Sequence, residues 1–238
     1  MVNVNTLIEG AKKLGIELSQ WQIEKFILYK ELLLEWNKKI NITSITDEVE
    51  VDIKHFIDSI TPMTTNLLED GIRVIDIGTG GGFPGIPLKI LNEDMELVLL
   101  DSLNKRIKFL DEVIDKLDLK GTQTIHGRAE ELGREEIHRE KYDIAISRAV
   151  ASLNTLSEYS LPFVKVGSYF IAMKGSDIDE ELLEAKEAIK ILGGRVKDKK
   201  FIKLPLSDIT HSLIIIEKIK RTPTKYPRGG GKPKKKPL

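Results

Sequence analysis

Five glycines and one proline fall within ten residues of the chain, in the stretch DIGTGGGFPG that begins at Asp76. Glycine loses more backbone entropy on folding than any other residue, so such a run needs a structural reason. The stretch follows an apolar run beginning at Arg73, which is typical of a buried strand. The loop therefore serves either to turn the chain tightly or to let a ligand lie against bare backbone.

Two ligand-binding patterns can be compared with this loop. The dinucleotide pattern G-x-G-x-x-G fits from Gly80 to Gly85, but it starts two residues later than the end of the strand favours. The pattern acid-x-Gly-x-Gly-x-Gly fits without adjustment at Asp76, Gly78, Gly80 and Gly82. It suits S-adenosylmethionine (SAM), whose methionine and ribose parts lie against backbone and which carries no phosphate. We expect these four residues to bind SAM, with Asp76 organising the loop or facing the ammonium group of the ligand. A plain tight turn is the alternative.

The ends of the next two predicted strands extend this site. Asp101 ends the strand after the glycine loop, 19 residues beyond Gly82, and its carboxylate can accept hydrogen bonds from both ribose hydroxyls. The alternative is a surface aspartate at a strand end. Ala129 and Glu130 follow the third strand, where their backbone groups can bind the edge of the adenine. Because ligands bind at the carboxyl ends of parallel strands, three strand ends are predicted to meet one nucleoside.

The elements that position these residues follow from hydrophobic periodicity. Candidate strands cover residues 73–78, 96–101, 122–126, 142–147, 168–174, 195–204 and 211–219. Candidate helices between them cover residues 85–91, 104–119, 130–140, 153–164 and 179–192. Alternating strands and helices imply a mainly parallel sheet covered on both faces. The last two strands have no helix between them and should form an antiparallel hairpin at the sheet edge.

The N-terminal part is predicted to be helical. Ser19 is a candidate N-cap for a helix that reaches about Ile40, and Asp47 for one that reaches about Ile60. We therefore predict an α/β protein with the Rossmann-like fold of class I SAM-dependent methyltransferases and a seven-stranded sheet. Its predicted parts are a helical extension over residues 1–65, a SAM-binding domain over 66–220 and a basic tail over 221–238.

Composition excludes several classes of protein. The chain has 238 residues, of which 41% are apolar and 31% charged, as in soluble globular proteins. No apolar run approaches the roughly 18 residues of a membrane span, and the N-terminus does not resemble a signal peptide. There is no cysteine, which excludes disulfides, cysteine metal sites and thiol nucleophiles. We expect a cytoplasmic protein without a metal. Its scattered histidines are interpreted as structural or surface residues: His55, His126, His138 and His211.

A net charge of zero hides an uneven distribution. Residues 221–238, RTPTKYPRGGGKPKKKPL, contain seven of the 37 basic residues and none of the 37 acidic ones. The tail therefore carries a charge of +7 and residues 1–220 a charge of −7. Four of the nine prolines and a glycine triplet also lie in the tail, which disfavours regular structure. It is either a solvated end that aids solubility, an arm that follows a phosphate backbone, or a segment that ties the chain back onto the domain.

Eight stretches from about Leu32 to the tail resemble, in the right order, the GidB/RsmG family. They are LLLEWNKKINITSI, HFIDSI, DIGTGGGFPGIPLKI, LLDSLNKRIKFL, GRAEEL, ISRAVASL, AMKG and KYPRGGGKPKKKPL. Members of that family use SAM to methylate N7 of one guanine in 16S ribosomal RNA. The resemblance implies an rRNA methyltransferase that acts on 16S rRNA or the small ribosomal subunit. We also expect the protein to be a monomer. It also implies SAM contacts at Gly78, Phe83, Ala129, Glu130 and Arg148.

The residues limit the kind of methyl transfer. Methylation at pyrimidine C5 needs a cysteine nucleophile and radical SAM chemistry needs cysteine ligands, and the chain has none. Transfer to an exocyclic amine usually places an Asn/Asp-Pro-Pro-aromatic turn after the fourth strand, where this chain reads Ser147-Arg148-Ala149-Val150. N7 of guanine has a free lone pair and no proton, so its methylation needs positioning and no general base.

Arg148 is the predicted positioning residue, because it lies just past the fourth strand where the target base should enter. A guanidinium can stack on a base or hold a phosphate. The alternative is a salt bridge with Asp143 or Glu158.

Further basic residues are predicted to contact RNA. Lys105 and Arg106 lie at the N-terminal end of a helix, against its dipole, which favours a phosphate partner over pairing with Asp101 or Asp111. The other predicted RNA contacts are Lys174 and, in the tail, Arg221, Lys225, Tyr226, Arg228, Lys232, Lys234, Lys235 and Lys236. Two alternative functions stay open. One is a 2′-O-methyltransferase, in which Lys174 and an acid would activate a ribose hydroxyl, and the other is a non-catalytic RNA-binding module.

Overall fold

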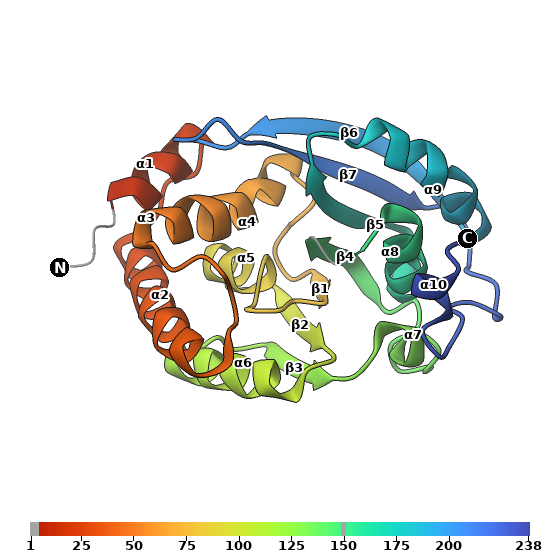
Figure 1. Cartoon of the computed structure of the whole chain (residues 1–238), viewed down its shortest axis with the longest axis horizontal. Helices are drawn as coiled ribbons and strands as arrows, with labels where there is room; N and C mark the ends of the chain where they lie inside the picture. The colour runs from red at the N-terminus through yellow and green to blue at the C-terminus, as the bar shows by residue number, and fades with distance from the viewer. Residues whose placement is uncertain (1–4, 149–150) are drawn as a thin grey trace.

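The computed structural model of the chain describes residues 5–148 and 151–238, and it contains one seven-stranded sheet (Figure 1). The strand order is β3-β2-β1-β4-β5-β7-β6. The strands are β1 (Arg73–Ile77), β2 (Glu96–Asp101), β3 (Thr122–His126), β4 (Tyr142–Arg148), β5 (Val164–Gly175), β6 (Gly194–Lys203) and β7 (Thr210–Lys218). The first five are parallel to one another, whereas β7 is antiparallel to both β5 and β6. The predicted fold, including the terminal hairpin, is confirmed.

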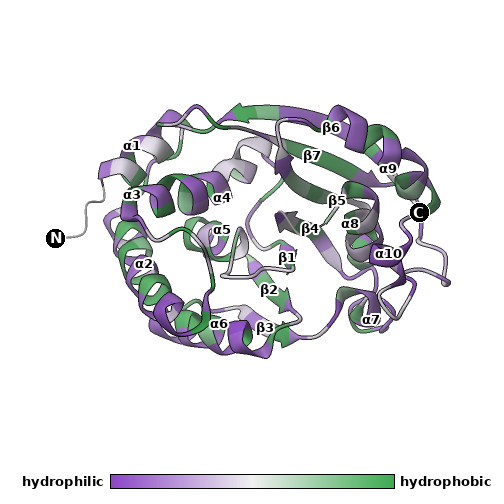
Figure 2. Cartoon of the chain, viewed as in Figure 1, coloured by the Kyte–Doolittle hydropathy of each residue, from purple (hydrophilic) through white to green (hydrophobic). Residues whose placement is uncertain are grey.

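Helices cover both faces of the sheet. The α-helices are α1 (Asn5–Lys13), α2 (Gln20–Ile40), α3 (Glu48–Val51), α4 (Asp58–Ile60), α5 (Gly85–Leu91), α6 (Asn104–Lys116), α7 (Ala129–Leu132), α8 (Leu153–Ser160), α9 (Asp179–Ile191) and α10 (Lys232–Lys235). Short 3-10 helices span Thr61–Thr65 and Leu161–Phe163. In Figure 2 the strands β2 and β7 are largely hydrophobic, whereas α2 and α9 alternate between hydrophobic and hydrophilic residues. Within the described part of the chain, no helix combines the length and the apolar character that crossing a membrane needs.

Two hydrophobic cores lie on the two faces of the sheet. Successive strand residues point to opposite faces, so Val74 belongs to one core and its neighbour Ile75 to the other. The first core is completed by α1, α2, the segment after α3, α5 and α6, and the second by α8 and α9. The N-terminal helices thus share a core with the sheet. The division of the chain at residues 65 and 220 stays a prediction.

The start and end of α2 follow directly from local sequence. Ser19 caps the helix as predicted: its hydroxyl accepts a hydrogen bond from the amide of Gln22, and the side chain of Gln22 accepts one from the amide of Ser19. Asn41 ends the helix in the left-handed conformation, with φ of 48°.

A continuous helical segment after α3 carries residues toward the sheet. Asp47 caps α3 as predicted, and the chain then passes through a π-helix at Asp52–Ile57 into α4. The buried carboxylate of Asp52 forms an ion pair with the buried Lys30 of α2, at 2.7 Å. Burial raises the pKa of Asp52 to about 6. This pair attaches the π-helical turn to α2, and such turns are frequent at functional sites.

Two predicted helices are much shorter in the structure, while the predicted helices 104–119 and 179–192 end three residues and one residue early. The predicted helix 130–140 is only α7, because the chain from Gly133 onward forms turns whose arginines bind another segment. Arg134 donates to the carbonyl of Pro227, and Arg139 to those of Thr222 and Tyr226. The predicted helix 153–164 ends at Ser160 and continues as a 3-10 turn before β5 begins.

The segment that receives these arginines is residues 221–238, which we call the C-terminal strap. It lies beside α7 and α8 and packs against them, so it is not the freely solvated end that was one of the alternatives, although α10 is the only helix that the structure describes in it, as its composition predicts (Figure 1). Tyr226 is 7% exposed and belongs to the second core. Arg228 binds the fully buried carboxylate of Glu158 through its backbone amide and its guanidinium, at 2.6–3.1 Å. Specific side-chain contacts therefore overcome the weak local preference for structure.

Candidate active site

A cavity of about 780 Å³ opens at the carboxyl edge of the parallel strands. Its walls come from the glycine loop after β1 and from the ends of β2, β4 and β5. The loop after α2, the π-helix, α4 and the start of β7 complete it. Because β7 is antiparallel, its first residues lie at the edge where the parallel strands end. The volume is within the range of about 300–1,000 Å³ that is usual for small-molecule sites.

The glycines of the loop have different structural roles. Gly78, Gly80 and Gly82 all have positive φ, of 71°, 61° and 95°. A Cβ atom added to Gly80 would meet only a backbone oxygen at 4.0 Å, so this glycine leaves open space at the cavity wall. A Cβ added to Gly82 would lie 2.6 Å from both Ile86 Cδ1 and Tyr29 Oη. Gly80 therefore gives a ligand access to backbone, whereas Gly82 is required for packing.

Asp76 lies beneath this loop, away from the cavity wall. Its Oδ2 accepts hydrogen bonds from the hydroxyl of Thr79 at 2.7 Å and from the amide of Gly85 at 2.9 Å. Burial raises the pKa of its carboxyl to about 6. Its Oδ1 is buried and has no hydrogen-bond partner among the described residues. In this structure Asp76 organises the loop, which is the first of the two roles expected for it.

Asp101 is 3% exposed and lines the cavity. Its carboxylate accepts hydrogen bonds from the amides of Gly80 and Leu103, both at 2.9 Å, and from Arg106 at 3.3 Å. An ionised carboxylate offers about four acceptor positions. One position therefore remains, and binding both ribose hydroxyls, as the sequence predicts, requires Arg106 to release Asp101.

Ala129 and Glu130 do not line the cavity. They begin α7, shortly after His126, which pairs with Asp101 in the sheet. Between them, the amide of Gly127 donates to the carbonyl of Asp101 at 3.0 Å. Glu130 is 5% exposed and lies 3.8 Å from the guanidinium of Arg128. The structure thus brings this turn beside the Asp101 end of the cavity, while the predicted adenine contact stays a prediction.

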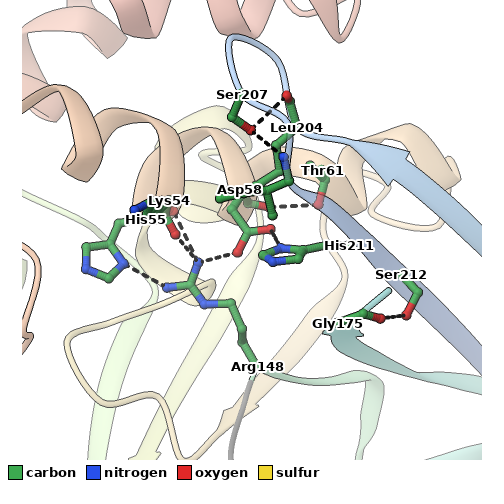
Figure 3. A network of polar contacts seen from close by, with 11 residues as sticks. Lys54, His55, Asp58, Thr61, Arg148, Gly175, Leu204, Ser207, His211 and Ser212 are labelled. Atoms are coloured by element: carbon green, nitrogen blue, oxygen red, sulfur yellow. Dashed lines mark hydrogen bonds and ion pairs between the residues drawn. The ribbon is translucent and has the colours of Figure 1, made fainter. Parts of the chain in front are cut away.

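Arg148 lies at the centre of a polar network that lines the cavity (Figure 3). Its Nη1 donates to Asp58 Oδ2 at 2.8 Å and to the carbonyls of Lys54 and His55 at 3.2 and 3.4 Å. The guanidinium carbon lies 5.1 Å from the ring centre of Phe83, close enough for a cation–π contact. Arg148 is thereby held between α4 and the glycine loop.

Neither of the salt-bridge partners considered from the sequence binds Arg148. Asp143 is bound by Lys165, and Glu158 is bound by Arg228. The observed partner, Asp58, is 1% exposed. Residues 149–150, at the position where the sequence differs from that of exocyclic-amine methyltransferases, lie outside the described residues.

Two histidines complete the network. His211 Nδ1 lies 2.7 Å from Asp58 Oδ1, and His55 stacks on the ring of Phe83 with centres 4.5 Å apart. Burial and then the charge of Arg148 lower the pKa of His55 to about 4, so it is neutral at pH 7. Burial alone would raise the pKa of Asp58, but the hydrogen bond from His211 and the charge of Arg148 outweigh burial and lower this pKa. The cavity thus holds the Asp58 carboxylate and the neutral imidazole of His55.

Sequence reasoning did not assign Asp58 to the site and interpreted His55 and His211 as structural or surface residues. The sequence did indicate that His55 and Asp58 lie together, because residues three apart on a helix share a face. No local signal places His211 opposite Asp58, from which it is separated by 153 positions.

The basic residues predicted to contact RNA near the cavity are mostly bonded to the protein. Arg106 pairs with Asp101 at 3.3 Å, which is the alternative considered from the sequence, and Lys105 donates to the last carbonyl of α2 at 3.2 Å. Lys174 forms an ion pair with Glu181 at 2.7 Å. Arg106 and Lys174 nevertheless line the cavity.

In the strap, the predicted RNA contacts divide into two groups. Tyr226 and Arg228 attach the strap to the domain, so in this structure they are not free to contact RNA. The others are exposed: Arg221, Lys225, Lys232, Lys234, Lys235 and Lys236. Among the residues that the structure describes, no group of three histidine or acidic side chains could hold a metal ion.

Comparisons with known proteins agree on one family. The family model for rRNA small subunit methyltransferase G (GidB) matches residues 22–210. A protein of Alkaliphilus metalliredigens named ribosomal RNA small subunit methyltransferase G is 55% identical over 232 residues, which cover 98% of this chain and 97% of that protein. A protein of the same name from Acetivibrio thermocellus is 54% identical, covering 98% and 95%.

Solved structures share the fold at low sequence identity. A SAM-dependent methyltransferase from Aquifex aeolicus has a TM-score of 0.53 and 18% identity, covering 74% of this chain and 96% of that one. M. jannaschii TYW2, solved in complex with AdoMet, has a TM-score of 0.52 and 15% identity, covering 68% and 77%. At these identities the likeness concerns the fold alone.

Proposed function

Because the chain belongs to the GidB family of small-subunit ribosomal RNA methyltransferases G, we propose that it transfers a methyl group from SAM to N7 of a guanine in 16S rRNA. One observation carries this proposal beyond the family. The cavity combines a ligand-accessible glycine loop with a network that positions Arg148, as suits transfer to N7 of guanine, which carries no proton for a base to remove.

The residues of the cavity fit SAM. Gly80 leaves open space at the wall, as a ligand lying against backbone requires, and Asp101 beside it keeps one acceptor position. When bound, SAM supplies a methyl group on a positively charged sulfur. Phe83 closes the same end of the cavity with an apolar ring that is 6% exposed.

The proposed reaction is a displacement. The N7 lone pair of guanine forms a bond to the methyl carbon as the bond from that carbon to sulfur breaks, and the positive charge moves to the purine ring. N7 carries no proton, so none is removed. Arg148 and the groups that hold it align the base with the methyl group and exclude water. His55 is neutral and already stacked on Phe83, which is consistent with a role in shape.

The 2′-O-methyltransferase alternative needs a base for the ribose hydroxyl. Lys174 is the candidate, and it is paired with the acid Glu181 at 2.7 Å and donates to the carbonyl of Ala151 at 2.9 Å. Because this alternative calls for a lysine and an acid, the position of the methyl group on the RNA must distinguish the two reactions. Mass spectrometry of digested RNA after reaction tests the proposal: methyl on guanine N7 is expected, and methyl on ribose would contradict it.

The substrate form can be determined in the same assay. Methyl transfer to naked 16S RNA, small subunits and intact ribosomes, each from a strain lacking the gene, shows which one is recognised. The non-catalytic alternative predicts no SAM binding by calorimetry, so a measurable dissociation constant for SAM excludes it.

The strap is the proposed RNA-contacting surface outside the cavity. Residues 1–220 carry −7 and repel a polyanion on average, whereas the strap carries +7. Its short helix α10 lies beside the first turn of α8, where Thr155 donates to the carbonyl of Pro233 at 3.2 Å. That turn begins shortly after Arg148 in the chain. We propose that the exposed lysines of this helix contact phosphates of the substrate near the cavity.

A further inference from the structure

The end of the cavity away from the glycine loop is formed by β5 and β7, and it has its own hydrogen-bonding groups. We propose that His211 and Arg148 read the target base: His211 Nε2 accepts the N1–H of guanine while Arg148 donates to O6. The base is then held by its Watson–Crick edge with N7 directed toward the cofactor. This inference rests on the proposed function and adds the residue that selects guanine over adenine.

The location of His211 follows from strand direction. It is the second residue of β7, which runs antiparallel to β5, and it pairs in register with Gly175, the last residue of β5. Its side chain is 33% exposed and lines the cavity, with Met173 and Ile209 as apolar neighbours on the wall. The residues expected to bind the cofactor lie in the loop after β1 and at the end of β2, so the cavity extends across the sheet edge from a cofactor end to a His211 end.

Asp58 determines which atom of His211 is free. The carboxylate of Asp58 is ionised and only accepts hydrogen bonds, so His211 Nδ1, at 2.7 Å, must donate to it. In the neutral ring this leaves a lone pair on Nε2. Among the described residues Nε2 has no hydrogen-bond partner, which leaves it available to a ligand in the cavity.

Arg148 offers the complementary group beside it. Both side chains bind the same carboxylate, Arg148 through Nη1 at 2.8 Å and His211 through Nδ1 (Figure 3). The Nη2 atom of Arg148 has a single contact, with His55 Nδ1 at 3.4 Å, so one of its hydrogens is free. The cavity thus presents a donor next to an acceptor, held in fixed relation by Asp58.

This pair of groups fits guanine and does not fit adenine. Guanine has an acceptor at O6 next to a donor at N1, whereas adenine has a donor at N6 next to an acceptor at N1. Adenine would therefore meet a donor with a donor and an acceptor with an acceptor. Both purines have an N7 lone pair, so the methyl transfer itself does not distinguish them. Recognition must therefore come from atoms other than N7, here O6 and N1, and sites built around polar groups discriminate strongly because a mismatch leaves those groups unpaired.

Two substitutions of His211 separate base reading from a structural role. His211→Asn keeps a donor near the position of Nδ1, for Asp58, but has no atom at the position of Nε2. His211→Gln reaches the position of Nε2 with an amide oxygen but gives up the Asp58 hydrogen bond. We expect kcat/KM on small subunits lacking the methyl group to fall about 10–100-fold in the Asn variant and much less in the Gln variant. SAM affinity, measured by calorimetry, should be unchanged in both.

A structural role predicts the reverse order, because only the Gln variant loses the bond to Asp58. Wild-type activity in the Asn variant, or equal losses in both variants, would overturn the inference. His138→Asn is the matched control, since His138 bonds to Tyr142 away from the cavity.

Modified substrates test the inference on the unaltered enzyme. Inosine at the target position keeps O6 and N1–H, whereas 2-aminopurine has neither and retains N7. We expect inosine to be methylated at a rate close to that of guanine and 2-aminopurine at least about ten times more slowly. Equal rates for the two analogues would overturn the inference. If the wild-type enzyme places its methyl group elsewhere than on guanine N7, the proposed function fails first, independently of these comparisons.

Discussion

Replacing Gly80 by valine should abolish SAM binding while the protein stays folded. A Cβ at Gly80 meets only a backbone oxygen at 4.0 Å, so the added side chain enters open space at the cavity wall rather than the core. The cost to stability is then mainly the positive φ of 61°, which for an L-residue amounts to roughly 1–2 kcal/mol. Folding should survive a loss of this size, which is a fraction of typical domain stability.

The matched variant is Gly82→Ala, two residues along the same loop. It adds a smaller side chain at a position that also has positive φ, but its Cβ would lie 2.6 Å from Ile86 Cδ1 and Tyr29 Oη. Overpacking of this kind costs about 1–3 kcal/mol beyond the backbone strain. The Gly82 variant should therefore lose more stability than the Gly80 variant, although its side chain is smaller.

Urea denaturation and SAM calorimetry on the two variants test this reasoning. The expected result is a folded Gly80→Val protein without measurable SAM affinity and a clearly destabilised Gly82→Ala protein. Normal SAM affinity in the Gly80 variant would show that the cofactor lies elsewhere. Wild-type stability in the Gly82 variant would refute the packing argument.

Further predictions concern the cofactor, pH and the strap. Asp101→Ala should weaken SAM binding by about 1–3 kcal/mol in calorimetry, and unchanged affinity would contradict the ribose contact. The folded pKa of His55, about 4, is below its ordinary 6.5, so the unfolded state binds more protons between these values and stability is lost as pH falls through that window. Urea denaturation at pH 4–7 should show less of this acid sensitivity in His55→Gln, and an identical pH profile would contradict it. Arg228→Ala removes three of the four hydrogen bonds that Arg228 donates to the fully buried carboxylate of Glu158, and it should lower the free energy of unfolding by about 3–5 kcal/mol. Release of the strap would expose Glu158 to water and so limits this loss. Adding Glu158→Leu should recover much of that loss in urea denaturation, and no recovery would argue against an unpaired charge as its cause. Replacing the four lysines of residues 232–236 by glutamine should leave the melting temperature unchanged and lower the log–log salt dependence of RNA binding by up to about 3, and an unchanged slope would remove these lysines from the proposed RNA surface.

The local pattern of the sequence was sufficient for most of the fold. The predicted bounds of β2, β3 and α5 match the structure residue for residue, and Ser19 caps α2 as expected. These features depend on hydrophobic periodicity, caps and glycine, which act between residues close in the chain. The order of strands and helices then led to a parallel sheet, and with it to the edge where the glycine loop and Asp101 meet.

The position of the strap could not be predicted from local sequence. Proline, glycine and lysine have little local preference for structure, so composition could not decide between a solvated end, an arm on a phosphate backbone and a segment tied back onto the domain. In the structure, Tyr226 anchors the strap in the second core and Arg228 anchors it on Glu158. Both residues are far in sequence from the residues that they contact. The strap also accounts for the shortened helix predicted at 130–140, because Arg134 and Arg139 bind carbonyls of the strap.

The partners of Arg148 also depended on tertiary structure. Its position at the end of β4 followed from the sequence, but Asp58 and His211 come to it from an N-terminal helix and from the C-terminal hairpin. They meet because the N-terminal helices pack on the sheet and because β7 is antiparallel to β5. Local sequence thus determined the glycine loop, Asp101 and the position of Arg148 at the end of a strand. Long-range packing and strand direction decided that Arg148 and His211 share the carboxylate of Asp58, because no local pattern relates residues so far apart in the chain.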